Sequence, residues 1–425
     1  MNTPNAKDRE ISPEQLCIGL YVHLDLPWTE HPFTFSSFKI KSLDQIATLQ
    51  ALGLKSLRFS PERSDGQPLE RPTDAPAPPP AAAHPSQDDP AYQVKRERLA
   101  RMAAHQAKVA ACERALMSSG RAVKSITQNL FAKPKEAYEE ASTLIGGMAD
   151  SMLVDADVAI QLMADKIGNE DVYYHSLNVA ILSMILAREL KAPAAAVKLV
   201  GLGALLHDIG KADLPERVVR KFTPLTTAEA AVFQLHCEKG VAMGKAMGVS
   251  AEVRAIIEQH HEMVDGSGYP RRLNGSQLTL LTRIVALVNA YDNLCNPLDP
   301  QRALTPHEAM SIIYGQRRAQ FDGMVLTTFV RSVGIYPPGT VVALSNGTLG
   351  MVVSVNSSRP LKPTVLVYDP GVPKDSAVVV DLEQEPDVTV SSTLRPAQLP
   401  AEVFDYLSPR KRTTYYFNAE RGAAS

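Results

Sequence analysis

The residues best suited to chemistry centre on the sequence Leu-Leu-His-Asp-Ile-Gly-Lys at positions 205–211. It places the imidazole of His207, the carboxylate of Asp208 and the ammonium of Lys211 within about one helical turn. A hydrophobic run precedes them, so the predicted helix should carry the imidazole and the carboxylate into a domain interior. Burying both groups without partners would cost free energy, and a metal ion is a natural partner for them.

Four further histidines stand in suggestive contexts nearby, namely His175, His236, His260 and His261. A single histidine is more often packed or hydrogen-bonded than a ligand, but this set exceeds the four ligands that one tetrahedral ion needs. Imidazoles and carboxylates without thiolates suit iron, manganese, nickel or zinc. We therefore expect two or three divalent ions, which could activate a water and hold the oxygens of a phosphodiester. Lys211 could stabilise the developing charge, or be an ordinary solvated cation at a helix end.

Residues 171 to about 322 resemble an HD-GYP domain, the branch of the HD phosphohydrolase superfamily that degrades the bacterial second messenger cyclic di-GMP. The matching segments, in the order and spacing of that family, are Tyr174-His175-Ser176, His207-Asp208-Ile209-Gly210-Lys211, His236, His260-His261-Glu262, Asp265-Gly266-Ser267-Gly268-Tyr269-Pro270, Tyr291-Asp292 and Gln320-Phe321-Asp322. The resemblance implies hydrolysis of cyclic di-GMP to pGpG or GMP through a metal-bridged hydroxide, with iron or manganese as the expected metal.

The resemblance also implies a role for each site residue. The implied metal ligands are His175, His207, Asp208, His236, His260 and His261, with Asp208 bridging two ions and Asp171 available for a third ion. Lys211 would contact the scissile phosphate. Gly268, Tyr269, Pro270 and Arg271 would shape the nucleotide pocket, although two glycines and a proline also make a plain turn.

Two departures from the family pattern affect the expected chemistry. Asn289 stands where the family usually has its last metal-binding aspartate, and the next carboxylate is Asp292. An amide brings no charge, so we expect the metal to be held less tightly or one ion to be lost. Leu298 and Arg302 stand where the family often has an Arg and Lys pair that holds substrate phosphates, so one positive charge is retained.

Three functions are compatible with these residues. We favour a cyclic-guanylate-specific phosphodiesterase, on the His, Asp and Lys set and the Gly-Tyr-Pro loop. The first alternative, motivated by Asn289 and Leu298, is a module that binds cyclic di-GMP or docks to a GGDEF-domain protein without efficient turnover. The second is an HD-type phosphohydrolase that acts on another nucleotide. A homodimer is a further candidate assembly.

The composition along the chain predicts a multidomain protein, with an all-α HD-type catalytic domain between a small α+β domain and a small β-rich domain. The predicted segments are an α+β domain at 1–60, a Pro/Ala-rich linker at 61–91, a helical connector at 92–166, the catalytic domain at 167–334, the β-rich domain at 335–390 and a C-terminal tail at 391–425. Residues 11 to about 60 also resemble the domain of unknown function that often precedes HD-GYP domains, through Gly19-Leu20-Tyr21-Val22, Trp28, His31-Pro32-Phe33 and Ile46.

Hydrophobic periodicity predicts the main elements. Helices are expected at 42–52, 172–190, 194–208, 227–247, 251–261, 276–294 and 305–314, and the connector should break at Lys133-Pro134. Front-domain strands are expected within 16–26, 33–40 and 54–59. Later β-rich runs at 341–344, 351–355, 364–368 and 377–380 predict an antiparallel sheet or barrel that ends near Asp387.

Bulk properties narrow the partners and the compartment. A formal net charge of −2 argues against a DNA-binding surface, and four dispersed cysteines suggest neither a disulfide framework nor a thiolate zinc site. No apolar run approaches the roughly 20 residues of a membrane-spanning helix, and the N-terminus lacks the features of a signal peptide. We therefore expect a cytoplasmic protein.

Overall fold

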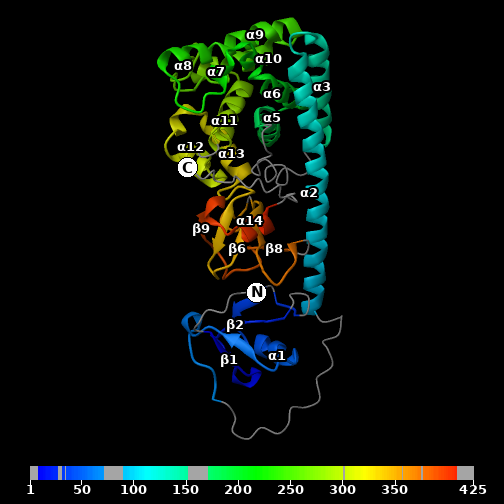
Figure 1. Cartoon of the computed structure of the whole chain (residues 1–425), viewed down its shortest axis with the longest axis vertical. Coiled ribbons are helices and arrows are strands. Elements are labelled where there is room, and N and C mark those ends of the chain that lie inside the picture. Colours follow the sequence, from blue (N-terminus) through cyan, green and yellow to red (C-terminus); the bar gives the residue numbers. More distant parts are fainter. Residues whose placement is uncertain are drawn as a thin grey trace, which may run out of the picture. The chain divides into compact units, whose positions relative to one another are not determined.

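The computed structural model describes residues 8–26, 31–33, 35–70, 90–151, 171–299, 302–356, 358–374 and 377–408 (Figure 1). They form two compact units, each described by itself. One unit extends to Ala107 and includes 343–350 and 364–392, and the other contains Lys108–Val342, Met351–Pro363 and residues from Thr393 onward. A helical region that follows one sheet and precedes another confirms the predicted multidomain fold class. The exact domain boundaries stay predictions.

The N-terminal sheet has four antiparallel strands in the order β1-β4-β2-β3. Its region contains β1 (Arg9–Ile11), β2 (Tyr21–His23), β3 (Ser37–Lys39), α1 (Leu43–Ala51) and β4 (Leu57–Phe59). Leu49 of α1 shares one hydrophobic cluster with Val22 and Phe59 of the sheet, so the predicted α+β character is confirmed. The sequence analysis missed β1, because three residues are too few to show an alternating pattern.

Residues 64–69 fall within the predicted linker but are bonded to the N-terminal sheet region. The amide of Asp65 donates to the carbonyl of Gly19 at 2.9 Å, and the amide of Leu69 donates to the carbonyl of Gln15 at 2.9 Å. These bonds hold residues 64–69 against the N-terminal sheet region, so the linker prediction was wrong for this stretch. The rest of that linker up to residue 89 lies outside the described residues.

Two helices follow the linker. They are α2 (Pro90–Asn129) and α3 (Pro134–Ser151), and the predicted break at Lys133-Pro134 is confirmed. Proline suits the first turn of α3, where an amide would have no helical acceptor. The connector's remaining residues, 152–166, lie outside the described part of the chain.

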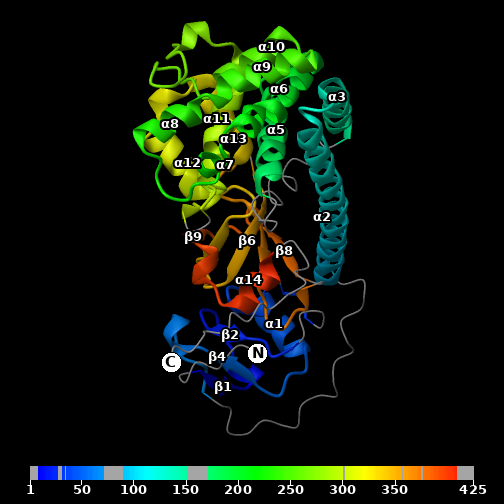
Figure 2. The ribbon, with the colours of Figure 1, turned by 45° about the horizontal axis from the view of Figure 1, so that its top comes forward.

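The region from Asp171 to Val333 is helical (Figure 2). Its helices are α5 (Asp171–Glu189), α6 (Ala194–Leu206), α7 (Glu216–Val219), α8 (Thr227–Gln234), α9 (His236–Met247), α10 (Ala251–Gln259), α11 (Leu280–Cys295), α12 (Pro306–Gly315) and α13 (Gly323–Val333). A short 3-10 helix, Ile209–Asp213, follows α6. The sequence analysis did not predict α13, which Asp322 caps by accepting from the amides of Met324 and Val325. Within the described residues, no helix is both long and apolar enough to cross a membrane.

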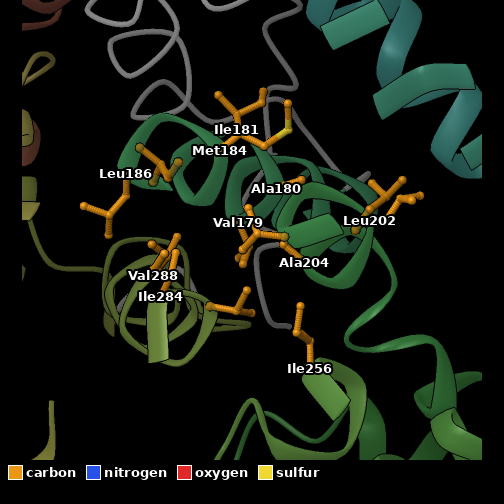
Figure 3. Close-up of a cluster of buried hydrophobic side chains, with 14 of the residues drawn as sticks. Val179, Ala180, Ile181, Met184, Leu186, Leu202, Ala204, Ile256, Ile284 and Val288 are labelled. Carbon is orange, nitrogen blue, oxygen red and sulfur yellow. The ribbon is translucent and has the colours of Figure 1, made fainter. Parts of the chain in front are cut away.

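Helix α6 lies at the centre of the helical core. Every residue from Val200 to Leu206 is buried, and the helix packs against α3, α5, α10 and α11. A helix segment that is hydrophobic on all sides is stable only when other elements surround it, and these four helices surround this part of α6. Figure 3 shows this packing through labelled side chains of α5 (Val179, Ala180), α6 (Leu202, Ala204), α10 (Ile256) and α11 (Ile284, Val288).

Four predicted helices differ from the structure by two or more residues at one end or by a division, and the others differ by a single residue at each end. The helix predicted at 194–208 ends at Leu206, and the one at 251–261 ends at Gln259. The segment 227–247 forms two helices instead of one, with the division at Leu235. Helix α11 begins at Leu280 instead of 276, because Thr279 caps it by accepting from the amide of Thr282 at 3.2 Å.

The C-terminal sheet has five strands in the order β8-β7-β6-β5-β9. They are β5 (Val341–Leu344), β6 (Leu349–Ser354), β7 (Thr364–Val367), β8 (Val378–Asp381) and β9 (Val390–Leu394). The predicted end near Asp387 and the tail from 391 were wrong here, since β9 forms an edge strand and α14 (Ala401–Leu407) follows it. The Ser and Thr residues of β9 are partly exposed, so the strand lacks the apolar pattern that identified the others. Residues 409–425 of the predicted tail lie outside the described residues.

Gly210 permits a close contact between the turn after α6 and helix α9. A Cβ atom at this position would lie 2.0 Å from the carbonyl oxygen of His236 and 2.5 Å from the amide nitrogen of Gly240. Both neighbours are backbone atoms, which cannot move without shifting α9. The contact therefore fixes the distance between the residues around Asp208 and those at the start of α9.

We predict that Gly210→Ala lowers the free energy of unfolding by about 1–3 kcal/mol through overpacking. Gly146→Ala in α3 is the matched control, because no atom lies within 4 Å of the Cβ that it would add. The control should stabilise its helix by about 0.5–1 kcal/mol. Thermal unfolding followed by circular dichroism compares the two variants, and equal melting temperatures for Gly210→Ala and wild type would contradict the packing argument.

Candidate metal centre

Asp208 lies in a tight turn at the end of α6. Its backbone angles, φ −102° and ψ 7°, are not helical, and its carbonyl accepts from the amide of Lys211 at 3.0 Å in the first turn of the 3-10 helix. The buried α6 delivers His207 and Asp208, and this turn directs Lys211 back toward them. Nζ of Lys211 forms an ion pair with Oδ2 of Asp208.

The carboxylate of Asp208 faces two pairs of histidines with its two oxygen atoms. Oδ2 lies 3.6 Å from Nε2 of His175 and 3.3 Å from Nε2 of His207. Oδ1 lies 3.5 Å from Nε2 of His236 and 3.6 Å from Nε2 of His260. Within each pair the two Nε2 atoms are 3.2 Å apart. One carboxylate therefore joins two groups of potential ligands.

The other ring nitrogen of three histidines is held by the backbone. Nδ1 of His207, His236 and His260 lies 2.6, 2.6 and 2.9 Å, respectively, from the carbonyl oxygen three residues earlier. Donation from Nδ1 to this carbonyl leaves the Nε2 lone pair free for a ligand. In a continuous helix, this carbonyl would accept from the backbone amide of the residue after the histidine. Because the imidazole takes that place, the regular helix ends or divides at each of these positions.

His175 is held by a carboxylate instead. Its Nδ1 lies 2.6 Å from Oδ2 of Asp292, and the other oxygen of Asp292 accepts from Nδ2 of Asn178 at 3.1 Å. The sequence analysis noted Asp292 as part of a matching family segment and as the carboxylate after Asn289, without assigning it a role, and it missed Asn178. The helical spacing of His175 and Asn178 on α5 was the one available signal for the latter, since it puts both on the same face.

Burial favours the neutral form of His236, His260 and His261. Desolvation lowers the pKa of His260 to about 3 and also lowers that of His236. Burial, with the neighbouring His260, lowers the pKa of His261 far below its usual value. Burial alone would favour the neutral acid of Asp208, but His207 and Lys211 hold the pKa of this carboxyl well below its usual range. Neutral imidazoles around an ionised carboxylate are the protonation states that metal binding needs.

The donor set fits divalent metal ions. Two clusters, Asp208 with His236, His260 and His261, and Asp208 with His175 and His207, each have one ligand atom per residue within 4.8 Å of the others. Oδ1 of Asp208 and Nε2 of His261 are buried but have no hydrogen-bond partner among the described residues. Orphaned acceptors in a buried site are costly unless a cation satisfies them.

The Gly-Tyr-Pro loop packs against this centre. The ring of Tyr269 stacks on His261, with centroids 4.5 Å apart and an angle of 20° between the planes. A Cβ on Gly268 would lie 2.5 Å or closer to backbone atoms of residues 261–263, so only glycine fits there. The predicted loop is thus in contact with the histidines, while Pro270 and Arg271 are exposed at its outer edge.

Glu262 holds this loop in place, a role that the sequence analysis did not assign. Its side chain is 1% exposed, and its two oxygens accept from the amides of Arg271 at 2.6 Å and Leu273 at 2.9 Å. Its position directly after the histidine pair was the only sequence signal.

The remaining predicted residues are placed less centrally. Asn289 is 3% exposed, and its Oδ1 accepts from Nδ2 of Asn293 at 2.7 Å, beside His260 and His261. Arg302 is exposed in the loop after α11 and is not among the residues of the clusters or cavities described here. Asp171 begins α5, but its side chain lies outside those that the structure describes.

A cavity of about 370 Å³ adjoins Asp208 and Lys211. Its wall is mainly apolar and includes Leu298 together with side chains from the end of α2 (Val123, Ile126, Thr127) and from Leu130, which directly follows that helix. The connector helix therefore contributes directly to the surroundings of the catalytic candidates. An apolar wall next to a charged centre suits a ligand with both ring systems and phosphates.

Two family models match the chain. The family described as Domain of unknown function (DUF3391) matches residues 8–141, and the family described as HD domain matches residues 148–325. The first match extends beyond the sheet region into α3. The second contains every histidine of the centre.

Named relatives support the same relationship. The cyclic di-GMP phosphodiesterase PA4108 of Pseudomonas aeruginosa is 30% identical over 367 residues, which is 85% of either chain. The 3'3'-cGAMP-specific phosphodiesterase 1 of Vibrio cholerae is 32% identical over 38% of this chain and 37% of that relative. The solved structure of Bd1817, an HDG"Y"P protein from Bdellovibrio bacteriovorus, has 15% identity and a TM-score of 0.45, covering 76% of this chain and 98% of the other.

The match to PA4108 covers most of both chains, and the two family models account for the front and the helical regions in the expected order. The predicted resemblance is thereby confirmed. The chain belongs to the family of cyclic di-GMP phosphodiesterases that join DUF3391 to an HD domain.

Proposed function

We propose that this protein is a metal-dependent phosphodiesterase that hydrolyses cyclic di-GMP in bacterial second-messenger signalling. The observation that carries the proposal is the carboxylate of Asp208, whose two oxygens each face a separate pair of histidines. This arrangement suits two cations that share one ligand, which is the two-metal logic of phosphodiester cleavage. The name of the relative PA4108 supports the substrate.

His175, His207, Asp208, His236, His260 and His261 would hold the metal. Two divalent ions, when bound, would supply an acidified water and positive charge for the phosphate oxygens. Iron or manganese is the proposed metal. A third ion would depend on Asp171, and Asn289 would weaken the binding of metal. Asp292 and the backbone carbonyls keep a proton on Nδ1 of their histidines, so that Nε2 stays available.

Lys211 would bind the scissile phosphate. Its ammonium lies beside Asp208 at the edge of the 370 Å³ cavity, where a phosphate oxygen could replace part of the ion pair. Tyr269, stacked on His261, would limit the nucleotide pocket on the side of the Gly-Tyr-Pro loop, with Gly268, Pro270 and Arg271 shaping its rim. The contact of Arg302 with a substrate phosphate stays a prediction.

A second cyclic dinucleotide is a specific competitor for the substrate role. A relative from Vibrio cholerae is named for 3'3'-cGAMP, although it matches a smaller part of this chain. Binding without turnover is the other alternative, because Asn289 and Leu298 replace charged residues of the family. Docking to GGDEF-domain proteins, a homodimer and a cytoplasmic location stay predictions.

The function is tested with purified full-length protein loaded with iron anaerobically or with manganese. We expect loss of cyclic di-GMP and appearance of a linear product, and a lower rate with 3'3'-cGAMP. A protein that binds cyclic di-GMP in calorimetry but leaves it intact with either metal would support the binding-only alternative and overturn the proposal. Chelation of the metal should abolish the rate, and restoring the metal should recover it.

Asp208→Asn should remove at least one metal equivalent and reduce the rate roughly 100-fold or more, because the shared charged ligand is lost. The matched control is Asp213→Asn, which changes a half-exposed carboxylate on the same 3-10 segment that pairs with Lys239. Metal content by mass spectrometry and the hydrolysis rate are measured for both. A metal-replete Asp208→Asn protein would show that this carboxylate does not join the two ligand groups.

Asn289→Asp should raise the affinity for the metal by about tenfold or more, because a carboxylate replaces a neutral amide beside His260 and His261. Asn274→Asp is the control, since it changes an exposed residue that caps a 3-10 helix, where aspartate caps as well. Competition with a fluorescent chelator reports the affinities. An unchanged affinity in Asn289→Asp would place residue 289 outside the ligand set.

A further inference from the structure

A second cavity borders the metal centre on the side of His260 and His261. Its volume is about 170 Å³, and it is lined by His260, His261, Met263, Ala286, Asn289, Ala290, Asn293, Leu294 and Arg317. Apart from the two histidines, these residues come from the loop after α10 (Met263), from α11 and from the loop between α12 and α13. None of them lines the cavity that contains Asp208 and Lys211.

The polar lining of this cavity consists of hydrogen-bond donors and neutral groups. Arg317 provides the only formal positive charge among the described lining residues, and none of these residues is a carboxylate. Asn289 uses its Oδ1 to accept from Asn293 at 2.7 Å, which leaves the amide nitrogen of Asn289 as a donor. A cavity with donors, a cation and no acid is suited to an anion.

Arg317 is a half-buried cation for which the described part of the chain supplies no counter-ion. Its Nε donates to Oε1 of Gln320 at 2.7 Å, and its guanidinium lies 5.7 Å from the centroid of the Phe321 ring. Within the described residues it forms no ion pair, and burial lowers the pKa of Arg317. Holding an arginine in this position costs solvation energy, which an anionic ligand would offset.

Backbone hydrogen bonds fix the position of Arg317 relative to the candidate metal centre. The amide of Arg317 donates to the carbonyl of Ile312 at 3.1 Å, which closes the end of α12. The carbonyl of Gln320 accepts from the amide of Val264 at 2.9 Å, in the loop that follows the histidine pair. The loop with the guanidinium and the loop with the histidines are therefore joined directly.

We propose that Arg317 and Asn289 form a subsite for a phosphate group of the nucleotide, separate from the scissile phosphate beside Lys211. The volume is below the roughly 300 Å³ of a small-molecule pocket, so the subsite takes a phosphate group and not a nucleoside. Planar guanidinium donors match the oxygens of a phosphate. The inference rests on the proposed function, since it assigns a second phosphate contact at the same centre.

Two phosphates of the same chemistry could occupy the subsite. One is the phosphate of the cyclic dinucleotide that is not cleaved, and the other is the terminal 5'-phosphate of the linear product. The first would make Arg317 a determinant of the KM for the cyclic substrate. The second would make it a determinant of product affinity and product release.

The test compares Arg317→Gln and Arg317→Lys with Arg318→Gln in the metal-loaded full chain. Arg318 is the matched control, because it is the adjacent arginine and is exposed, over the ring of Tyr314. Calorimetry measures the binding of cyclic di-GMP, of the linear dinucleotide pGpG and of inorganic phosphate, and steady-state kinetics separates KM from kcat.

We expect Arg317→Gln to weaken phosphate and at least one dinucleotide by about 10-fold to 100-fold, the effect of losing a hydrogen bond to a charged group. Arg317→Lys should recover part of this loss, and Arg318→Gln should bind as wild type. Weaker cyclic di-GMP indicates the uncleaved phosphate, and weaker pGpG alone indicates the product's terminal phosphate. Unchanged binding of all three ligands in Arg317→Gln would overturn the subsite.

Metal content and melting temperature separate this outcome from a structural effect. If Arg317 only supports the fold, Arg317→Gln lowers the melting temperature while the folded protein binds phosphate normally, which also overturns the inference. A wild type that does not hydrolyse cyclic di-GMP but loses phosphate binding in Arg317→Gln refutes the proposed function and leaves the anion subsite standing. A fully active Arg317→Gln enzyme with normal affinities refutes the anion subsite and leaves the proposed function standing.

Discussion

The carboxylate of Asp208 is the group on which the helical region depends. It is an ionised acid in a desolvated position, with the Nε2 atoms of four histidines between 3.3 and 3.6 Å away. Each of these imidazoles has its Nδ1 beside another acceptor, and a ring whose proton is held there cannot also donate from Nε2 to the carboxylate. The site is consequently rich in lone pairs and poor in protons, and a cation is the partner that satisfies it.

The packing of the hydrophobic core positions these groups around the centre. The second half of α6, Val200–Leu206, is buried on all sides and ends just before His207 and Asp208, while α9 and α10 bring His236 and His260 from neighbouring positions. Gly210 lets the turn after α6 approach the backbone of α9. Packing energy from apolar helices thus offsets the cost of gathering polar groups at the points where these helices end.

The two cavities beside the centre have different chemistry. The larger one combines Lys211 and Asp208 with an apolar wall to which α2 contributes, and the smaller one combines Arg317 with neutral amides. The replacement of a family aspartate by Asn289 acts in the smaller cavity, where it removes a negative charge near Arg317. The departure at Asn289, which was expected to weaken metal binding, is therefore also a feature that favours an anion in the smaller cavity.

Residue order and type alone determined the main features of fold class and site. Strong periodicity identified most helices and strands, and the unusual density of His, Asp and Lys identified the residues of a cluster that could hold metal ions. Tertiary structure decided where the helices stop, how β9 joins the sheet, and which groups orient the ligands. His175 and Asp292 lie 117 positions apart, and their 2.6 Å contact depends on the packing of α5 against α11. Local patterns do not encode such a contact, because its energy comes from burial and hydrogen bonding between elements that meet only in the folded chain.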